Sequence, residues 1–168
     1  SSGLFEAIAV SSDSPEILDI SKKFGVDYSI FRPQELASDG APKLPAIQHC
    51  VNEVERISGE NFDVIVDLDV TSPLRLTKDI EGAVRLLEEK NVSNVITGCP
   101  ARRSPYFNLV ERDEDGYVRL SKTPEQTIVR RQDAPECFDM NASIYVWKRE
   151  GLIGSESIFN ADTLLFVM

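Results

Sequence analysis

The sequence predicts an α/β fold in which a mainly parallel sheet is wrapped by helices and carries an inserted β-hairpin arm. Strand-like apolar runs alternate with helix-like segments up to Pro100, and such alternation is typical of parallel sheets with right-handed crossovers. The alternation then breaks, and two strand-like runs flank a turn. The length of 168 residues suits a single domain, here 1–168.

The first elements are a strand, a helix and a second strand. Ala7–Val10 is a short apolar run. Ser14 and the proline after it provide the cap and first turn of a helix, which Gly25 should end. Residues 26–31 predict the second strand. The segment 32–45 is rich in Pro, Gly, Asp and Ser, and a loop of this length after a strand is a candidate for ligand binding.

The segment from 44 to 97 repeats the pattern. Apolar residues at helical spacing predict a helix over 44–57. Residues 62–69 form the most buried-looking strand of the chain. A helix over 80–90 and a strand over 94–97 follow. Polar clusters at the ends of these strands are where ligands of an open α/β sheet bind.

The last third of the chain predicts the arm and two final strands. Residues 106–110 and 117–120 read as a hairpin with Gly116 at its turn. Residues 143–147 and 164–167 are strand-like again. No internal repeat interrupts this order.

Composition excludes several classes of partner. The chain has 18 Lys and Arg against 28 Asp and Glu, a net charge of −10, which disfavours nucleic acid. No apolar run approaches the ~20 residues of a membrane span, so we expect a cytoplasmic protein without membrane contact. Three cysteines at wide spacings indicate reduced thiols. His49 is the single histidine and reads as a helix-surface residue, so acid–base or metal chemistry would have to rest on carboxylates.

Two polar clusters are the candidate chemical groups. Asp67 and Asp69 point to the same face of their strand, and a cation such as Mg²⁺ could hold them together. The alternative is that Asp69 caps the following turn while Asp67 is solvated or paired with an arginine. Arg130 and Arg131 could bind a carboxylate or phosphate, or pair with acidic neighbours. The residues alone assign no reaction.

The chain resembles the CMP-sialic acid synthetase family, also called acylneuraminate cytidylyltransferases. The resemblance is carried by VSSDSPEI, FRPQELASDGA, VIVDLDVTSPLR, PARRSPYFNLVE and RRQDAPECFDMNASIYVW, in this order over almost the whole chain. The forms DLDVTSPLR and RRQDAP are most similar to the branch acting on bacterial nonulosonic acids such as legionaminic acid.

The resemblance implies transfer of CMP from CTP to the anomeric hydroxyl of a nine-carbon α-keto acid sugar, with release of pyrophosphate. Mg²⁺ would neutralise the phosphates, and positioning would do most of the catalysis. It implies no certain catalytic side chain. The implied CTP-binding residues are Arg32, Ser38, Asp39, Ala41 and Lys43. The implied sugar-binding residues are Asp69, Thr71, Ser72, Arg131, Gln132, Asp139, Asn141, Tyr145 and Phe159.

The family pattern also implies an arm and a set of metal ligands. The segment 101–131 corresponds to an arm through which relatives form homodimers. The family's phosphate loop matches nothing here, and its DxD metal pair, the main metal ligands, is expected beyond Met168. We therefore expect a chain shortened at both ends and inactive alone, with Asp67 and Asp69 as the metal ligands if it were active.

Two alternatives to this function stay open. One is a non-catalytic nucleotide-binding α/β domain. The other is a cytidylyltransferase for another keto-sugar, such as 3-deoxy-manno-octulosonate.

Overall fold

The computed structural model describes residues 3–123, 128 and 130–168, with the side chain of Arg131 outside the description. Its elements alternate strands and helices along the chain. They are β1 (Ala9–Ser12), α1 (Pro15–Lys23), β2 (Tyr28–Phe31), η1 (Gln34–Leu36), α2 (Lys43–Ser58), β3 (Val64–Leu68), α3 (Thr77–Lys90), β4 (Asn94–Pro100), β5 (Val110–Arg112), β6 (Val118–Leu120), η2 (Arg131–Asp133), β7 (Phe138–Lys148), α4 (Arg149–Ile153) and β8 (Leu164–Val167).

A four-stranded sheet of order β3-β7-β4-β8 forms the centre, and β1 and β2 form a separate parallel pair. β7 is antiparallel to β3 and to β4, whereas β4 is parallel to β8. Three of the four central strands therefore run in one direction and β7 runs in the other. The predicted α/β class is confirmed, and the sheet is mixed because the chain leaves the body on β4 and returns beside it on β7.

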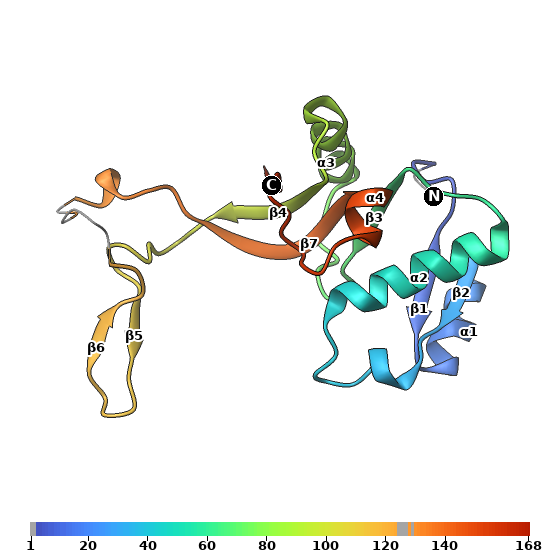
Figure 1. Ribbon diagram of the computed structural model, residues 1–168, viewed down its shortest axis with the longest axis horizontal. Coiled ribbons are helices and arrows are strands. Elements are labelled where there is room, and N and C mark those ends of the chain that lie inside the picture. Colours follow the sequence, from blue (N-terminus) through green and yellow to red (C-terminus); the bar gives the residue numbers. More distant parts are fainter. Residues whose placement is uncertain (1–2, 124–127, 129) are drawn as a thin grey trace.

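Helices cover both faces of the central sheet, as Figure 1 shows. On one face, Leu87 of α3 packs against Val95 and Val146, all fully buried. On the other, Leu44 of α2 and Leu152 of α4 pack near neighbouring strand residues that point the opposite way. Alternate side chains of each strand thus enter two different cores.

Local sequence signals explain the helix ends. The Ser14 hydroxyl accepts a hydrogen bond from the Ile17 N–H at 3.4 Å at the start of α1. α2 ends at Gly59, whose φ of +76° is readily adopted only by glycine. α3 also ends at a residue in the left-handed region, Asn91, with a φ of +53°. At its start, the Asp79 carboxylate accepts a hydrogen bond from the Leu76 N–H at 2.9 Å and caps the first turn. No helix among the described residues is long and apolar enough to cross a membrane.

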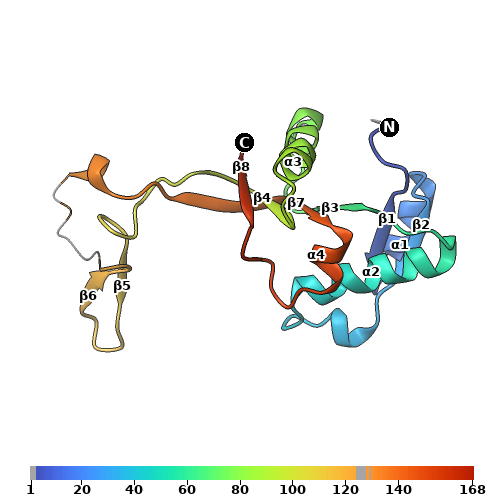
Figure 2. The same cartoon turned by 45° about the horizontal axis from the view of Figure 1, so that its top comes forward.

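The arm leaves the body where β4 and β7 continue as a pair. Cys99 lies opposite Asp139, and Pro100 opposite Phe138. The hairpin of β5 and β6 extends from the far end, away from the body, in both Figure 1 and Figure 2. Gly116 has a φ of +91° at its tip, as the turn prediction requires.

Several element bounds differ from the expectations, for identifiable reasons. Residues 106–109 form a turn rather than a strand, because the Ser104 carbonyl accepts the N–H groups of three residues there. β3 is the edge of the central sheet and is only partly buried, whereas β4 and β7 are more deeply buried. An apolar run indicates a strand but not its place in the sheet.

Candidate active site

The predicted carboxylates at the end of β3 converge on one lysine. Asp67 and Asp69 point to the same face of the strand, as expected, and Lys43 reaches them from the first turn of α2. The Lys43 Nζ lies 2.7 Å from Asp67 Oδ2 and 3.2 Å from Asp69 Oδ2. The lysine side chain is 36% exposed and each aspartate side chain 23% exposed. Two carboxylates and one ammonium leave this cluster with a charge of −1.

Tyr145 provides an aromatic face beneath the ammonium. It lies opposite Asp67 in the β3–β7 ladder, and the Lys43 Nζ is 4.3 Å from the centre of its ring. The ring in turn stacks on Trp147, with centroids 5.5 Å apart and planes 5° apart. The lysine is therefore held by two carboxylates and a ring, which lie on β3, in the turn after it and on β7.

These contacts shift the pKa values of the charged groups. Burial acts to lower the pKa of Lys43, but its contacts with Asp67 and then Asp69 outweigh burial and raise it. The pKa of Asp69 falls to about 2, chiefly because the Thr71 hydroxyl and N–H donate to it, with a further contribution from Lys43. Burial raises the pKa of the Tyr145 phenol. At neutral pH the cluster holds one ammonium and an ionised Asp69.

The sequence left open the alternative that Asp69 caps the following turn while Asp67 is solvated or paired with an arginine. The structure agrees with it for Asp69 and partly for Asp67. Asp69 Oδ1 accepts the Thr71 N–H at 2.9 Å and the Thr71 hydroxyl at 2.7 Å, and thus caps the turn. Asp67 is paired, but with a lysine rather than an arginine. Its Oδ2 has no well-directed hydrogen bond from the described residues, so the ion pair alone holds it.

A large bulge in β7 directly precedes Tyr145. Ile96 faces Tyr145 and Gly98 faces Met140, so the single residue Thr97 lies opposite the four residues 141–144. Ala142 within the bulge has a φ of +53°, a conformation that costs a non-glycine residue free energy. Such outliers are concentrated at functional sites.

The bulge is stabilised by polar side chains. Asn141 Oδ1 accepts the Thr97 hydroxyl at 2.7 Å and the Ser143 N–H at 3.1 Å. The Thr97 hydroxyl also accepts the Ile144 N–H at 3.0 Å. Asn141 was predicted from the resemblance, whereas sequence reasoning missed the roles of Thr97 and Ser143, which only the bulge brings into contact.

The predicted CTP-binding residues lie along the loop from β2 to α2. The Arg32 guanidinium donates to the Ser11 hydroxyl at 3.1 Å and to the Ser11 carbonyl at 2.8 Å, and so ties β2 to β1. The Ala41 N–H donates to the Ser38 carbonyl at 2.9 Å, which shapes the turn around the exposed Asp39. The Lys43 side chain points away from this loop, to the carboxylates.

The remaining predicted sugar residues lie elsewhere. Ser72 is in the turn after Asp69, to whose carbonyl its N–H donates at 3.3 Å. Asp139 is on the arm side of β7, and Phe159 is 55% exposed before β8. Arg131 begins the short η2, but its side chain lies outside the described part of the chain.

The two neighbouring arginines do not form a free anion site together. Arg130 donates to both carboxylate oxygens of Asp133, at 2.8 Å and 3.0 Å. For Arg130, therefore, pairing with an acidic neighbour is the observed arrangement. Arg131 stays a candidate for the sugar carboxylate.

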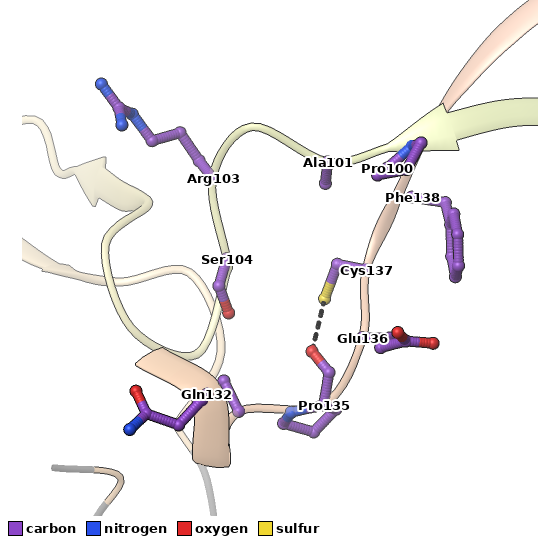
Figure 3. A pocket seen from close by; sticks show the side chains of 10 residues that line it. Pro100, Ala101, Arg103, Ser104, Gln132, Pro135, Glu136, Cys137 and Phe138 are labelled. Atoms are coloured by element: carbon purple, nitrogen blue, oxygen red, sulfur yellow. Dashed lines mark hydrogen bonds between the residues drawn. The ribbon is translucent and has the colours of Figure 1, made fainter. Parts of the chain in front are cut away.

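Gln132 lines a separate cavity at the base of the arm, of about 480 Å³. Figure 3 shows the cavity between the strand ends, with the Cys137 thiol directed at the Pro135 carbonyl, 3.4 Å away. Arg103 extends away from these two residues in the same view. Lys43, Asp67 and Asp69 do not line this cavity, so within one chain the arm residues and the Lys43 cluster form two separate sites.

The described residues do not present a ready metal site. No group of three or more His, Cys, Asp or Glu side chains converges in the part of the chain that the structure describes. Asp67 and Asp69 do converge, and they offer the carboxylate oxygens that Mg²⁺ prefers, but Lys43 already bridges them. A cation there would have to displace the ammonium.

Met168, beyond which the main metal ligands were expected, lies beside β4. Its N–H donates to the Gly98 carbonyl at 3.0 Å, and its partly buried side chain packs against the core under α3. Ligands that follow Met168 lie outside the described residues, so that expectation stays a prediction. The described part of the chain offers only the substitute pair, Asp67 and Asp69, and Lys43 occupies the position between them.

Comparison with known proteins identifies the family of the chain. The cytidylyltransferase family model matches residues 1–160. The chain is 42% identical over 167 residues to a CMP-N,N'-diacetyllegionaminic acid synthase of Campylobacter jejuni and to the post-translational flagellin modification protein B of Campylobacter coli. The match covers 99% of this chain and 70% of each relative.

Solved structures show the same fold at low identity. A CMP:2-keto-3-deoxy-manno-octonic acid synthetase complexed with CTP aligns with a TM-score of 0.61 at 14% identity, over 99% of this chain and 73% of that one. A 4-diphosphocytidyl-2C-methyl-D-erythritol synthase of Anaerococcus prevotii aligns with a TM-score of 0.58 at 11% identity, over 97% and 70%. By its sequence, the chain belongs to the cytidylyltransferase family.

Proposed function

We propose that the protein transfers CMP from CTP to the anomeric hydroxyl of a nine-carbon α-keto acid sugar of the legionaminic or sialic acid type. The observation that carries the proposal is the 42% identity to a CMP-N,N'-diacetyllegionaminic acid synthase across 99% of the chain. The sugar oxygen bonds to the α-phosphorus of CTP as the bond to the bridging oxygen breaks. Pyrophosphate leaves with that electron pair, and the hydroxyl proton is released.

Charge distribution supports one orientation of the sugar. The Lys43, Asp67 and Asp69 cluster carries a charge of −1, so it would repel the substrate carboxylate and attract hydrogen-bond donors. Hydroxyl or acetamido N–H groups of the sugar therefore face Asp69, and its carboxylate lies elsewhere. Arg131 is our candidate for that carboxylate, because a guanidinium matches its geometry with two parallel bonds.

CTP is assigned to the loop between β2 and α2. Arg32 anchors the start of this loop on β1, and we assign main-chain groups around Ser38, Asp39 and Ala41 to the pyrimidine edge. We expect a divalent cation, Mg²⁺, to accompany the nucleotide and neutralise its phosphates. In this chain Asp67 and Asp69 are candidate ligands only when Lys43 leaves its position between them, and the sugar orientation above applies to the cluster with Lys43 in place.

The arm supports a homodimer in which one chain completes its partner's site. Gln132 belongs to the short η2, and the orange segment that contains η2 lies on the arm in Figure 1, far from β3. The hairpin also exposes apolar side chains, with Tyr117 at 75% and Val118 at 65%, which favours burial in an interface. Val118→Asp should weaken the dimer in sedimentation. Ile57→Asp, equally apolar and 54% exposed on α2, is the matched control and should not.

The central experiment is a substrate panel with CTP and Mg²⁺. The whole gene product and the 168-residue chain are each offered N,N'-diacetyllegionaminic, N-acetylneuraminic and pseudaminic acids and 3-deoxy-manno-octulosonate. With the whole gene product, CMP-sugar and pyrophosphate should form fastest with the legionaminic acid. If the whole gene product binds CTP in calorimetry but forms no product from any sugar, the domain is non-catalytic and the proposal is refuted.

The residue assignment has its own test. Arg131→Ala should raise the sugar KM far more than the CTP KM, since the guanidinium is assigned to the sugar carboxylate. Arg130→Ala is the control, because Arg130 already pairs with Asp133. Equal effects of Arg131→Ala on both KM values would contradict the assignment.

A further inference from the structure

Arg75 links two segments of the site that the strand ladder does not connect. Its guanidinium donates to the carbonyl of Asp69 from Nη2 at 2.6 Å. From Nη1 it donates to the carbonyl of Ser143 and, at 3.3 Å, to the Ser143 hydroxyl. The first contact lies just past the end of β3 and the others lie in the bulge of β7.

Regular hydrogen bonding between β3 and β7 stops just before the two segments that Arg75 joins. Regular pairing of β3 with β7 ends at Leu68 opposite Ile144. Beyond it, the one backbone hydrogen bond between these two segments in the described chain is from the Asp69 N–H to the Ser143 carbonyl, at 3.2 Å, and the neighbouring Ala142 has a positive φ. Arg75 supplies the bonds that a regular ladder would have made.

The Arg75 guanidinium acts here as a hydrogen-bond donor to neutral oxygens and not as a partner in an ion pair. Among the described residues no carboxylate lies within 4.0 Å of its nitrogens, since none of the ion pairs includes Arg75. All its acceptors are neutral oxygens on two separate segments. A planar fork can reach both at once, whereas a lysine ammonium acts as a single point.

Two predicted sugar-binding residues depend on these bonds. Asp69 is bonded to Arg75 through its own carbonyl. Asn141 is reached through Ser143, whose N–H donates to Asn141 Oδ1 at 3.1 Å. We infer that Arg75 is a positioning residue that holds Asp69 and Asn141 in a fixed relative placement for the sugar. The catalytic consequence rests on the proposed function, while the structural one does not.

Hydrogen exchange measures the structural consequence without any substrate. In Arg75→Ala, and almost as much in Arg75→Lys, amides in peptides covering 69–76 and 139–146 should exchange faster than in the parent. Arg85→Ala, which removes an exposed arginine from α3, is the control and should leave both peptides unchanged. Trp147 fluorescence checks that each variant is folded. Unchanged exchange in both Arg75 variants would overturn the inference.

Kinetics measures the catalytic consequence. Small displacements of binding groups carry large rate penalties, so Arg75→Ala should lower kcat/KM for the sugar by about 10- to 100-fold and leave the CTP KM almost unchanged. Adding Arg75→Ala to Asn141→Ala should then cost less than the product of the two single losses, because part of the effect of Arg75 acts through Asn141. Fully multiplicative losses would show that Arg75 does not act through Asn141 and would overturn its positioning of that residue.

The two proposals fail in different ways. Absence of CMP-sugar formation with every sugar would refute the proposed function and leave the exchange result as the test of Arg75. If the parent is active but Arg75→Ala raises the KM for CTP as much as the KM for the sugar, the assignment of Arg75 to the sugar side is refuted.

Discussion

Replacing Lys43 with methionine removes the ammonium that Asp67 and Asp69 share, and the cost can be worked out from the contacts. Exposed ion pairs contribute about 0–1 kcal/mol, and breaking buried ones costs about 3–5 kcal/mol. The Lys43–Asp67 and Lys43–Asp69 ion pairs, at 2.7 Å and 3.2 Å, are partly exposed, so their contribution should lie between these two limits. With about 0.5–1 kcal/mol from the Tyr145 ring, we expect Lys43→Met to lower the free energy of unfolding by about 2–3 kcal/mol near pH 7.

The pH dependence gives the sharper test. The pKa of Asp69 is about 2 in the folded protein against an ordinary 3.8, so its stabilisation is present above the ordinary value and is lost as pH falls toward 2. The pKa of Lys43 is raised, so its contribution is lost only as pH rises past its ordinary value of 10.5. The gap between parent and variant should be widest between about pH 5 and pH 9.

The assay is urea denaturation followed by the fluorescence of Trp147, the single tryptophan, which is fully buried and stacked on Tyr145. In Lys43→Met, Thr71 still donates hydrogen bonds to Asp69. The variant should therefore still lose stability as pH falls toward 2, but less than the parent does. Lys78→Met removes an exposed lysine that has no ion pair among the described residues and should change little. A gap between the parent and Lys43→Met that is equal near pH 3 and pH 7 would refute the ionic reasoning.

Three further predictions concern packing, reactivity and strain. Gly151→Ala should destabilise the fold by about 1–3 kcal/mol in the same urea assay, because the new Cβ would lie 2.7 Å from the Ser93 carbonyl, whereas Gly40→Ala meets open space and should not. Burial raises the pKa of Cys50 to about 11, so its alkylation near neutral pH, followed by mass spectrometry, should be far slower than that of free cysteine. Ala142→Gly should raise the unfolding free energy by about 0.5 kcal/mol, and a loss would show that the methyl group packs usefully.

The sequence predicted the elements well where local signals are strong. Leu164–Val167 forms a strand at the bounds expected, and the helix over 44–57 is found as Lys43–Ser58. The two-residue spacing of Asp67 and Asp69 also placed them on one face. Periodicity is a local property, so it survives in the fold wherever a strand or helix has one buried face.

The resemblance named residues, but their partners could not be read from it. Lys43 was expected beside the nucleotide, and in the structure its side chain contacts Asp67 of β3 and Asp69 just after this strand. Arg75 was part of a quoted motif without a role, and its contact with Ser143 spans 68 positions of the chain. Contacts of this kind follow from the order of strands, which local pattern does not encode.

By itself, the sequence determined the α/β class, the family resemblance and the face that carries the two carboxylates, because these depend on spacing and on motifs within single segments. Only the tertiary structure decided that β7 runs against its neighbours, that its bulge sets Thr97 opposite four residues, and that Lys43 and Arg75 meet their partners. The physical reason is that charge pairing and backbone hydrogen bonding act between segments, and the chain brings those segments together only when it folds.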